Sequence, residues 1–184
     1  VDFSGVIDPP LIGAGALTLG SGTATVNTAG LIDADLIGVI AVNIGTGHAA
    51  VNNSADVFSS SGTTPILGVG AAKIGNNSAT GAQDVIVSNS GDVSDYAVGV
   101  LGLAIGDGND VLVENNGGAI EGGFVGIAGA VIGNGVGGSL TISNSGTIQN
   151  NLGVGIIGLG IGDDHTIGIG NTGSVTAAYV GGAG

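Results

Sequence analysis

Carboxylates in glycine-rich turns are the side chains of this sequence best suited to hold a ligand. Asp107 and Asp110 lie within residues 106–112, and Asp163 and Asp164 follow another Ile-Gly pair. Ca²⁺ takes carboxylate and carbonyl oxygens as ligands, so these four aspartates could line a calcium site. The turn pattern occurs only once, in a degenerate copy, whereas such a site needs consecutive turns. We therefore expect no cofactor and keep Ca²⁺ at these aspartates as the alternative.

Other groups that catalysis uses are scarce. Lys73 is the single lysine, arginine is absent, and the two histidines, His48 and His165, lie far apart in the sequence. A β-helix that cleaves acidic polysaccharides generally combines clustered carboxylates with a cationic base or clamp, which one lysine cannot supply. A metal shared by the two histidines is equally unexpected. The sequence therefore predicts that the protein is not an enzyme.

Asparagines recur in a short motif that ends in a turn. The motif has the form Val/Ile-x-Asn followed by Ser, Thr or Asn, and its asparagines are Asn53, Asn89, Asn115, Asn144 and Asn171. Their steps of 36, 26, 29 and 27 residues indicate a repeat, and a Ser/Thr/Pro-rich insertion at residues 59–65 lengthens the first step. Aligned asparagines in a solenoid corner commonly stack and hydrogen-bond to one another and to the turn. We interpret these five as a structural ladder.

A second motif repeats independently with nearly the same period. It is an eight-residue aliphatic segment that begins with glycine, and its leading glycines are Gly13, Gly38, Gly68, Gly99, Gly126 and Gly155. Strand-length apolar pieces separated by Gly and Asn/Asp turns at such a period are typical of a β-solenoid. The sequence therefore predicts an all-β protein, a right-handed parallel β-solenoid (β-helix) of about six coils, with roughly 25–31 residues per coil.

Composition agrees with one solenoid domain over residues 1–184. Glycine contributes 41 residues and hydrophobic residues 43%, while charged residues are only 8%, a profile that favours strands and tight turns over helices. The net charge of −13, with one basic side chain, makes nucleic acid an unlikely partner by Coulomb repulsion. No long uninterrupted apolar run predicts a membrane-spanning helix, so we expect no membrane insertion by this segment.

Alternation within the second motif assigns its two faces. We expect Ile40, Val42 and Ile44, with their counterparts in other coils, to form an interior ladder. The opposite face is then outward and consists of small residues, among them Ala41, Gly102, Gly129 and Gly158. A soluble monomer normally places polar side chains on such a face. We therefore predict that these small residues form an assembly face.

The asparagine motif resembles the passenger repeats of bacterial autotransporters and related large β-helical surface adhesins. The resemblance is carried by residues 89–91 (Asn-Ser-Gly), 144–146 (Asn-Ser-Gly) and 171–173 (Asn-Thr-Gly) and extends over nearly the whole chain from about Val26. It implies secretion and display at the cell surface, with a signal peptide already removed. Such a motif specifies a fold and a compartment better than a function.

Two functions of different classes follow from these expectations. The first is an extracellular structural subunit that self-associates, head-to-tail or laterally, into a surface fibre, sheath or biofilm-matrix-like assembly; neither end of the sequence shows a capping segment, which favours stacking. The second is a passenger segment of an autotransporter-type adhesin that binds host or neighbouring-cell ligands. The expected partners are accordingly copies of the chain itself or other cell-surface molecules.

Overall fold

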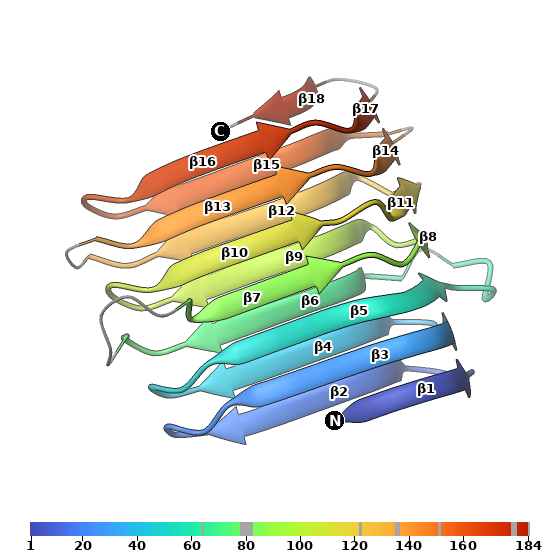
Figure 1. Cartoon of the computed structure of the whole chain (residues 1–184), viewed down its shortest axis with the longest axis horizontal. Coiled ribbons are helices and arrows are strands. Elements are labelled where there is room, and N and C mark those ends of the chain that lie inside the picture. Colours follow the sequence, from blue (N-terminus) through green and yellow to red (C-terminus); the bar gives the residue numbers. More distant parts are fainter. Residues whose placement is uncertain are drawn as a thin grey trace.

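The structure is a parallel β-solenoid, as a computed structural model of the chain shows (Figure 1). It describes residues 1–63, 65–77, 83–121, 123–134, 137–150, 152–177 and 180–183. Over these residues no helix is present and every strand pairing is parallel. The predicted stack of about six coils is confirmed.

Two sheets run along the stack. The 7-stranded sheet, here sheet B, consists of β2 (Ile12–Leu19), β4 (Ile37–Ile44), β6 (Leu67–Ile74), β9 (Val98–Ile105), β12 (Val125–Ile132), β15 (Val154–Ile161) and β18 (Val180–Ala183). The 11-stranded sheet, here sheet A, consists of β1 (Asp2–Ile7), β3 (Ala24–Asp33), β5 (Ala49–Phe58), β7 (Val85–Asn89), β8 (Val93–Ser94), β10 (Asp110–Asn115), β11 (Ala119–Glu121), β13 (Ser139–Asn144), β14 (Thr147–Asn150), β16 (Thr166–Asn171) and β17 (Ser174–Ala177). The first six of these sheet B strands, β2 to β15, contain the six copies of the glycine-led motif.

A corner divides sheet A lengthwise. In the early coils the long strands β3 and β5 pass through this corner without a break. In later coils two shorter strands replace each long one, as where β7 and β8 both pair with β5. The predicted insertion at residues 59–65 lies between β5 and β6, and its Ser60 backbone N–H donates to Asp33 Oδ1 of the preceding coil at 2.8 Å.

The predicted orientation of sheet B is wrong: the small residues face the core. Ala41 is fully buried, and a Cβ built on Gly102 would lie 2.5 Å from Val113 Cγ2 of sheet A. A Cβ on Gly129 would lie 2.5 Å from Leu140 Cδ1, also in sheet A. Large side chains of sheet A thus fill the space that small residues of sheet B leave, as close packing requires. Gly158 likewise faces Ile167, so these four residues form no outer assembly face.

The aliphatic residues expected inside are consequently outside. Ile44 is 43% exposed, and its counterparts Ile105 and Ile161 are 38% and 50% exposed. The core is instead lined by Val39, Val100 and Ile127 from sheet B against the inward side chains of sheet A. Because both faces of these strands are apolar, alternation alone fits either orientation.

The leading glycines have a packing cause. A Cβ on Gly99 would lie 2.7 Å from the carbonyl oxygen of Gly126, its counterpart in the next coil, and 2.4 Å from Ile120 Cγ2. The counterparts Gly38 and Gly68 meet the next coil's carbonyl oxygen in the same way, at 2.6 and 2.7 Å. Only glycine lets successive coils approach this closely. One glycine per coil is therefore imposed by the stacking distance.

Tyr96 fills a second corner, and its phenol provides a test of this packing. Its hydroxyl donates to the carbonyl oxygen of Ala34 at 2.7 Å and lies 3.0 Å from that of Phe58. Burial raises the pKa of Tyr96 well above its ordinary value, and the carboxylates of nearby aspartates raise it further. The folded state therefore holds the phenolic proton more tightly than the unfolded state does.

This raised pKa gives a prediction for alkaline solution. Below the ordinary tyrosine pKa of about 10 the contribution of Tyr96 to stability is fully present, and it is lost as pH rises above that value. Tyr96→Phe should lower the free energy of unfolding by about 1–2 kcal/mol at neutral pH, because the buried Ala34 carbonyl oxygen loses the hydroxyl donor, while that of Phe58 keeps the Ala34 N–H. It should also flatten the fall in stability above about pH 10, measured by urea denaturation. Equal alkaline slopes for both chains would contradict the assignment.

Candidate functional site

The five predicted asparagines form one continuous hydrogen-bonded ladder at the corner of sheet A. Side-chain amides donate to the Oδ1 of the next coil: Asn53 to Asn89 at 2.7 Å, Asn89 to Asn115 at 2.9 Å, Asn115 to Asn144 at 2.8 Å and Asn144 to Asn171 at 2.8 Å. Thr28 Oγ1 continues the ladder by donating to Asn53 Oδ1. Each of these asparagines also donates to a carbonyl two or three residues further on. The side-chain amides of the ladder are therefore hydrogen-bonded within the corner itself.

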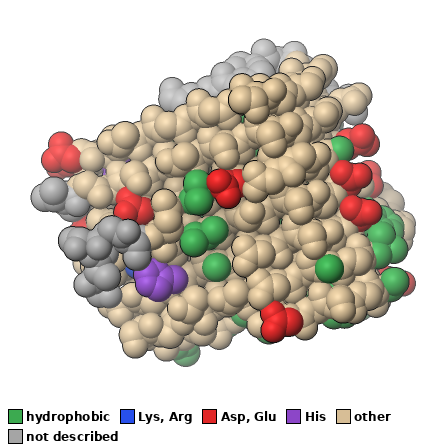
Figure 2. Space-filling view, viewed as in Figure 1, with side chains coloured by type: hydrophobic (Ala, Val, Ile, Leu, Met, Phe, Trp, Pro, Cys, Tyr) green, Lys and Arg blue, Asp and Glu red, His purple; other side chains and the backbone are tan. Residues whose placement is uncertain are grey.

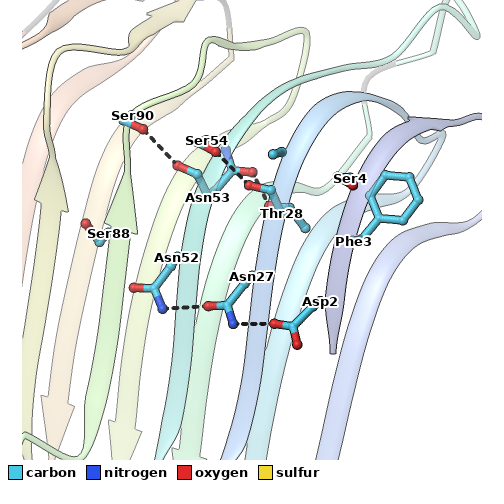
Figure 3. A pocket seen from close by; sticks show the side chains of 11 residues that line it. Asp2, Phe3, Ser4, Asn27, Thr28, Asn52, Asn53, Ser54, Ser88 and Ser90 are labelled. Atoms are coloured by element: carbon cyan, nitrogen blue, oxygen red, sulfur yellow. Dashed lines mark hydrogen bonds between the residues drawn. The ribbon is translucent and has the colours of Figure 1, made fainter.

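A shallow groove of about 470 Å³ follows the outside of this corner near β1, β3 and β5 (Figure 3). Asn52 Nδ2 donates to Asn27 Oδ1 at 2.8 Å, and Asn27 Nδ2 donates to Asp2 Oδ1 at 2.6 Å. Ser54 Oγ donates to the Thr28 carbonyl oxygen at 2.9 Å. With Phe3 at its edge, the groove offers amides, hydroxyls and one aromatic ring, the groups with which a protein orients a small polar ligand.

Two of the four aspartates predicted as calcium ligands, Asp107 and Asp110, cap turns of the next coil. Asp110 Oδ1 accepts the backbone N–H of Ser139 at 3.0 Å and its hydroxyl at 2.6 Å, while Asp107 Oδ1 accepts the N–H of Asn134 at 2.7 Å. Among the described residues no three acidic, histidine or cysteine side chains gather where they could hold a metal ion.

Their spacing explains why. Asp107 and Asp163 occupy matching turns two coils apart, because Gly106 bonds to β12 and Gly133 bonds to β15. Coils stack about 4.8 Å apart, so these turns lie roughly 10 Å from each other. Two ligands of one Ca²⁺ lie within about 5 Å of each other, given Ca–O distances of 2.3–2.6 Å. The described geometry therefore gives the calcium hypothesis no support.

The outward side of sheet B is a uniform aliphatic surface. Three rows run across β2, β4, β6, β9, β12 and β15 in register. We name this surface the outer aliphatic face; its rows are Gly15, Ile40, Gly70, Leu101, Ala128 and Ile157, then Leu17, Val42, Ala72, Leu103, Ala130 and Leu159, then Leu19, Ile44, Ile74, Ile105, Ile132 and Ile161. All are aliphatic or glycine.

The outer aliphatic face carries no charged side chain. The six strands that form it contain no aspartate or glutamate, and their one lysine, Lys73, is buried on the inward side. The other side of the molecule differs: Figure 2, seen from sheet A, shows acidic side chains scattered over the surface and around its margin. The two faces of the solenoid therefore differ in polarity: the face of sheet B is aliphatic, whereas the face of sheet A carries acidic side chains.

The dimensions of the outer aliphatic face match those of a protein interface. The six strands that carry it, spaced about 4.8 Å apart and each eight residues long at about 3.3 Å per residue, cover roughly 750 Å², of which the three rows take up about three quarters. A stable interface of standard size buries about 800 Å² on each partner. Monomeric proteins rarely leave an apolar patch of this size in water.

Comparison of the chain with protein-family models, with curated proteins and with solved structures returned no match. No helix in the described ranges is long and apolar enough to cross a membrane.

Proposed function

We propose that this chain is a structural segment of an extracellular β-solenoid that self-associates laterally, as part of a surface fibre, sheath or matrix-like assembly. The observation that carries the proposal is the outer aliphatic face, in which 18 outward positions in three rows contain no polar side chain. Burial of such a face against another apolar surface is favourable by about 25 cal/mol per Å² before the entropy of association is subtracted.

A second copy is the partner that fits this face best. Each chain carries a net charge of −13, so two copies repel unless their acidic groups stay apart. The outer aliphatic face is free of acidic residues, and a face-to-face pair keeps the acids of sheet A on the outside. The flat rows of aliphatic side chains are also repeated at every coil, so two such faces can interdigitate. The extracellular location is supported by the resemblance to autotransporter passengers.

Charge substitutions on the two faces test this proposal. Leu103→Lys with Leu159→Lys places two ammonium groups in the outer aliphatic face, and burying them in an interface is strongly unfavourable. Sedimentation velocity should show concentration-dependent association of the native chain and, for this variant, a dissociation constant raised more than about 100-fold. The control, Thr141→Lys with Gln149→Lys, makes the same charge change at exposed positions of sheet A and should associate like the native chain.

Two results would contradict the proposal of lateral self-association. One is a native chain that sediments as a monomer at every concentration, and the other is equal association of both lysine variants. In either case the adhesin alternative gains, because the groove beside Asn27, Asn52 and Phe3 is a second surface able to take a ligand. Its chemistry of amides, hydroxyls and one ring suits a polar ligand such as a glycan.

A further inference from the structure

The only lysine of the chain is buried inside the solenoid against a carboxylate. Lys73 in β6 and Asp84, just before β7, are both 0% exposed, and Lys73 Nζ donates to Asp84 Oδ1. The side chain of Lys73 points inward between Asn43 and Ala104, its partners in register on the neighbouring coils. A buried ion pair loses the hydration of both charges, and this loss is only partly offset by their mutual attraction.

Two further groups complete the surroundings of Asp84. Its Oδ2 accepts the backbone N–H of Asp110 at 3.0 Å. His48 Nδ1 lies 3.7 Å from its Oδ1, is buried, and has no hydrogen-bond partner. The His48 side chain as a whole is 34% exposed, so its ring connects the buried carboxylate to solvent. A nucleophile, an acyl carbon, an N–H donor and a proton carrier are thus assembled at one corner.

We propose that Lys73 and Asp84 form an intramolecular isopeptide bond. Transfer of one Nζ proton to the carboxylate gives an amine and a carboxylic acid. The nitrogen lone pair attacks Cγ of Asp84, a C–N bond forms, the Cγ–Oδ1 bond breaks, and Oδ1 leaves as water with a proton from the nitrogen. The oxidation states are unchanged, and the reaction needs no co-reactant.

The surroundings favour each part of this condensation. Fixed proximity of amine and acyl carbon corresponds to effective molarities of about 10⁵–10⁸ M. The Asp110 N–H lies where negative charge develops on Oδ2 in the tetrahedral intermediate. His48 Nδ1 can carry the proton from nitrogen to the leaving oxygen. The product is a neutral amide, so two buried charges disappear and a water molecule is released.

Asn43, on the strand next to Lys73, carries a buried acceptor that is not in use. It is the register partner of Lys73 on the preceding coil, and its Oδ1 is buried without a hydrogen-bond partner. An ammonium paired with Asp84 leaves this oxygen unused, whereas the N–H of an isopeptide bond requires one acceptor nearby. The bond would also join β6 covalently to the start of β7, closing the segment between them.

The composition makes the test simple, because trypsin has one cleavage site in the chain, after Lys73. The denatured native chain should resist trypsin, since the acylated lysine is no longer a substrate, and its intact mass should be lower than the sequence mass by one water molecule. Lys73→Arg retains the positive charge but cannot form the amide, so this chain should have its full sequence mass and be cut into residues 1–73 and 74–184.

His48 has its own matched control. His48→Ala should raise the fraction of denatured chain that trypsin cuts by about tenfold or more, given the usual contribution of proton transfer. His165→Ala changes the other histidine, whose hydrogen bonds among the described residues go to the carbonyl oxygens of Gly133 and Ile161, and should leave the cut fraction at the native level. A native chain of full mass that trypsin cuts completely after denaturation would overturn the isopeptide proposal and leave a plain ion pair.

Discussion

Asn115→Ala should lower the free energy of unfolding by about 3 kcal/mol, because it interrupts the asparagine ladder in the middle of the stack. Asn115 Oδ1 accepts from Asn89, and its Nδ2 donates to Asn144 Oδ1 at 2.8 Å and to the Gly118 carbonyl oxygen at 2.7 Å. The alanine leaves these groups without that partner in a dry interior. Each such unpaired group costs about 1–3 kcal/mol.

Asn116→Ala is the matched control one residue further along. Asn116 is exposed, and its Nδ2 donates to Ser88 Oγ at 3.2 Å on the surface, where water can replace it. Its loss should change the free energy of unfolding by less than about 0.5 kcal/mol. Urea denaturation followed by circular dichroism measures both variants. Similar losses for Asn115→Ala and Asn116→Ala would show that the ladder adds nothing beyond an ordinary surface hydrogen bond.

Gly99→Ala should destabilise the fold by a similar amount, about 3 kcal/mol, at the upper end for overpacking. The added methyl would meet the Gly126 carbonyl oxygen at 2.7 Å and Ile120 Cγ2 at 2.4 Å. A carbonyl held in the sheet cannot move away without breaking its own hydrogen bonds, so the two coils must separate.

Gly15→Ala provides the comparison on the same sheet. Gly15 lies in the outer aliphatic face, and its added methyl would meet Ile12 Cγ2 and Ile40 Cγ2 at 3.6 Å, an ordinary contact distance. The free energy of unfolding of Gly15→Ala should stay within about 0.5 kcal/mol of the native value or rise, because alanine loses less backbone entropy on folding than glycine does. Thermal unfolding curves distinguish the pair. Equal melting temperatures for Gly99→Ala and the native chain would refute the close approach of coils at the leading glycines.

The coil architecture is readable from sequence because each coil needs the same special residues once. Gly99 and its counterparts recur because only glycine fits between stacked coils, and Asn115 and its counterparts recur because the side-chain amide of one donates to the asparagine of the next coil. Both requirements act along the chain at a fixed period. Self-similarity alone therefore predicts the solenoid.

The orientation of sheet B could not be read in this way. Its strands are apolar on both faces, and their few polar side chains point to the wrong orientation. Asn43 and Lys73 share a face with Ala41, which suggests that this face is exposed to solvent, yet all three residues are buried. Asn43 Nδ2 is satisfied inside by Thr18 Oγ1 at 2.7 Å and the Gly22 carbonyl oxygen at 2.8 Å. The inward face is set by the size of side chains in sheet A, which only the three-dimensional packing reveals.

The pairing of Asp84 with Lys73 could not be predicted from the sequence for a related reason. Asp84 lies outside both repeated motifs, and its pairing with Lys73 depends on the inward direction of β6. The aspartates that the sequence did single out, such as Asp107 and Asp110, lie in regular turns and accept hydrogen bonds from backbone amides of the next coil. A carboxylate in a repeated turn is more readily explained by the turn than by a ligand.

Single-cysteine reporters test the orientation of sheet B and its role in assembly together. The chain has no cysteine, so Leu103→Cys and Ala104→Cys each introduce one thiol, the first on the outer aliphatic face and the second at a fully buried position. In dilute native protein a maleimide should label position 103 rapidly and position 104 only after unfolding, and labelling at 103 should slow as protein concentration rises. Rapid labelling at 104 would contradict the inward face, and a rate at 103 that is independent of concentration would contradict self-association through the outer aliphatic face.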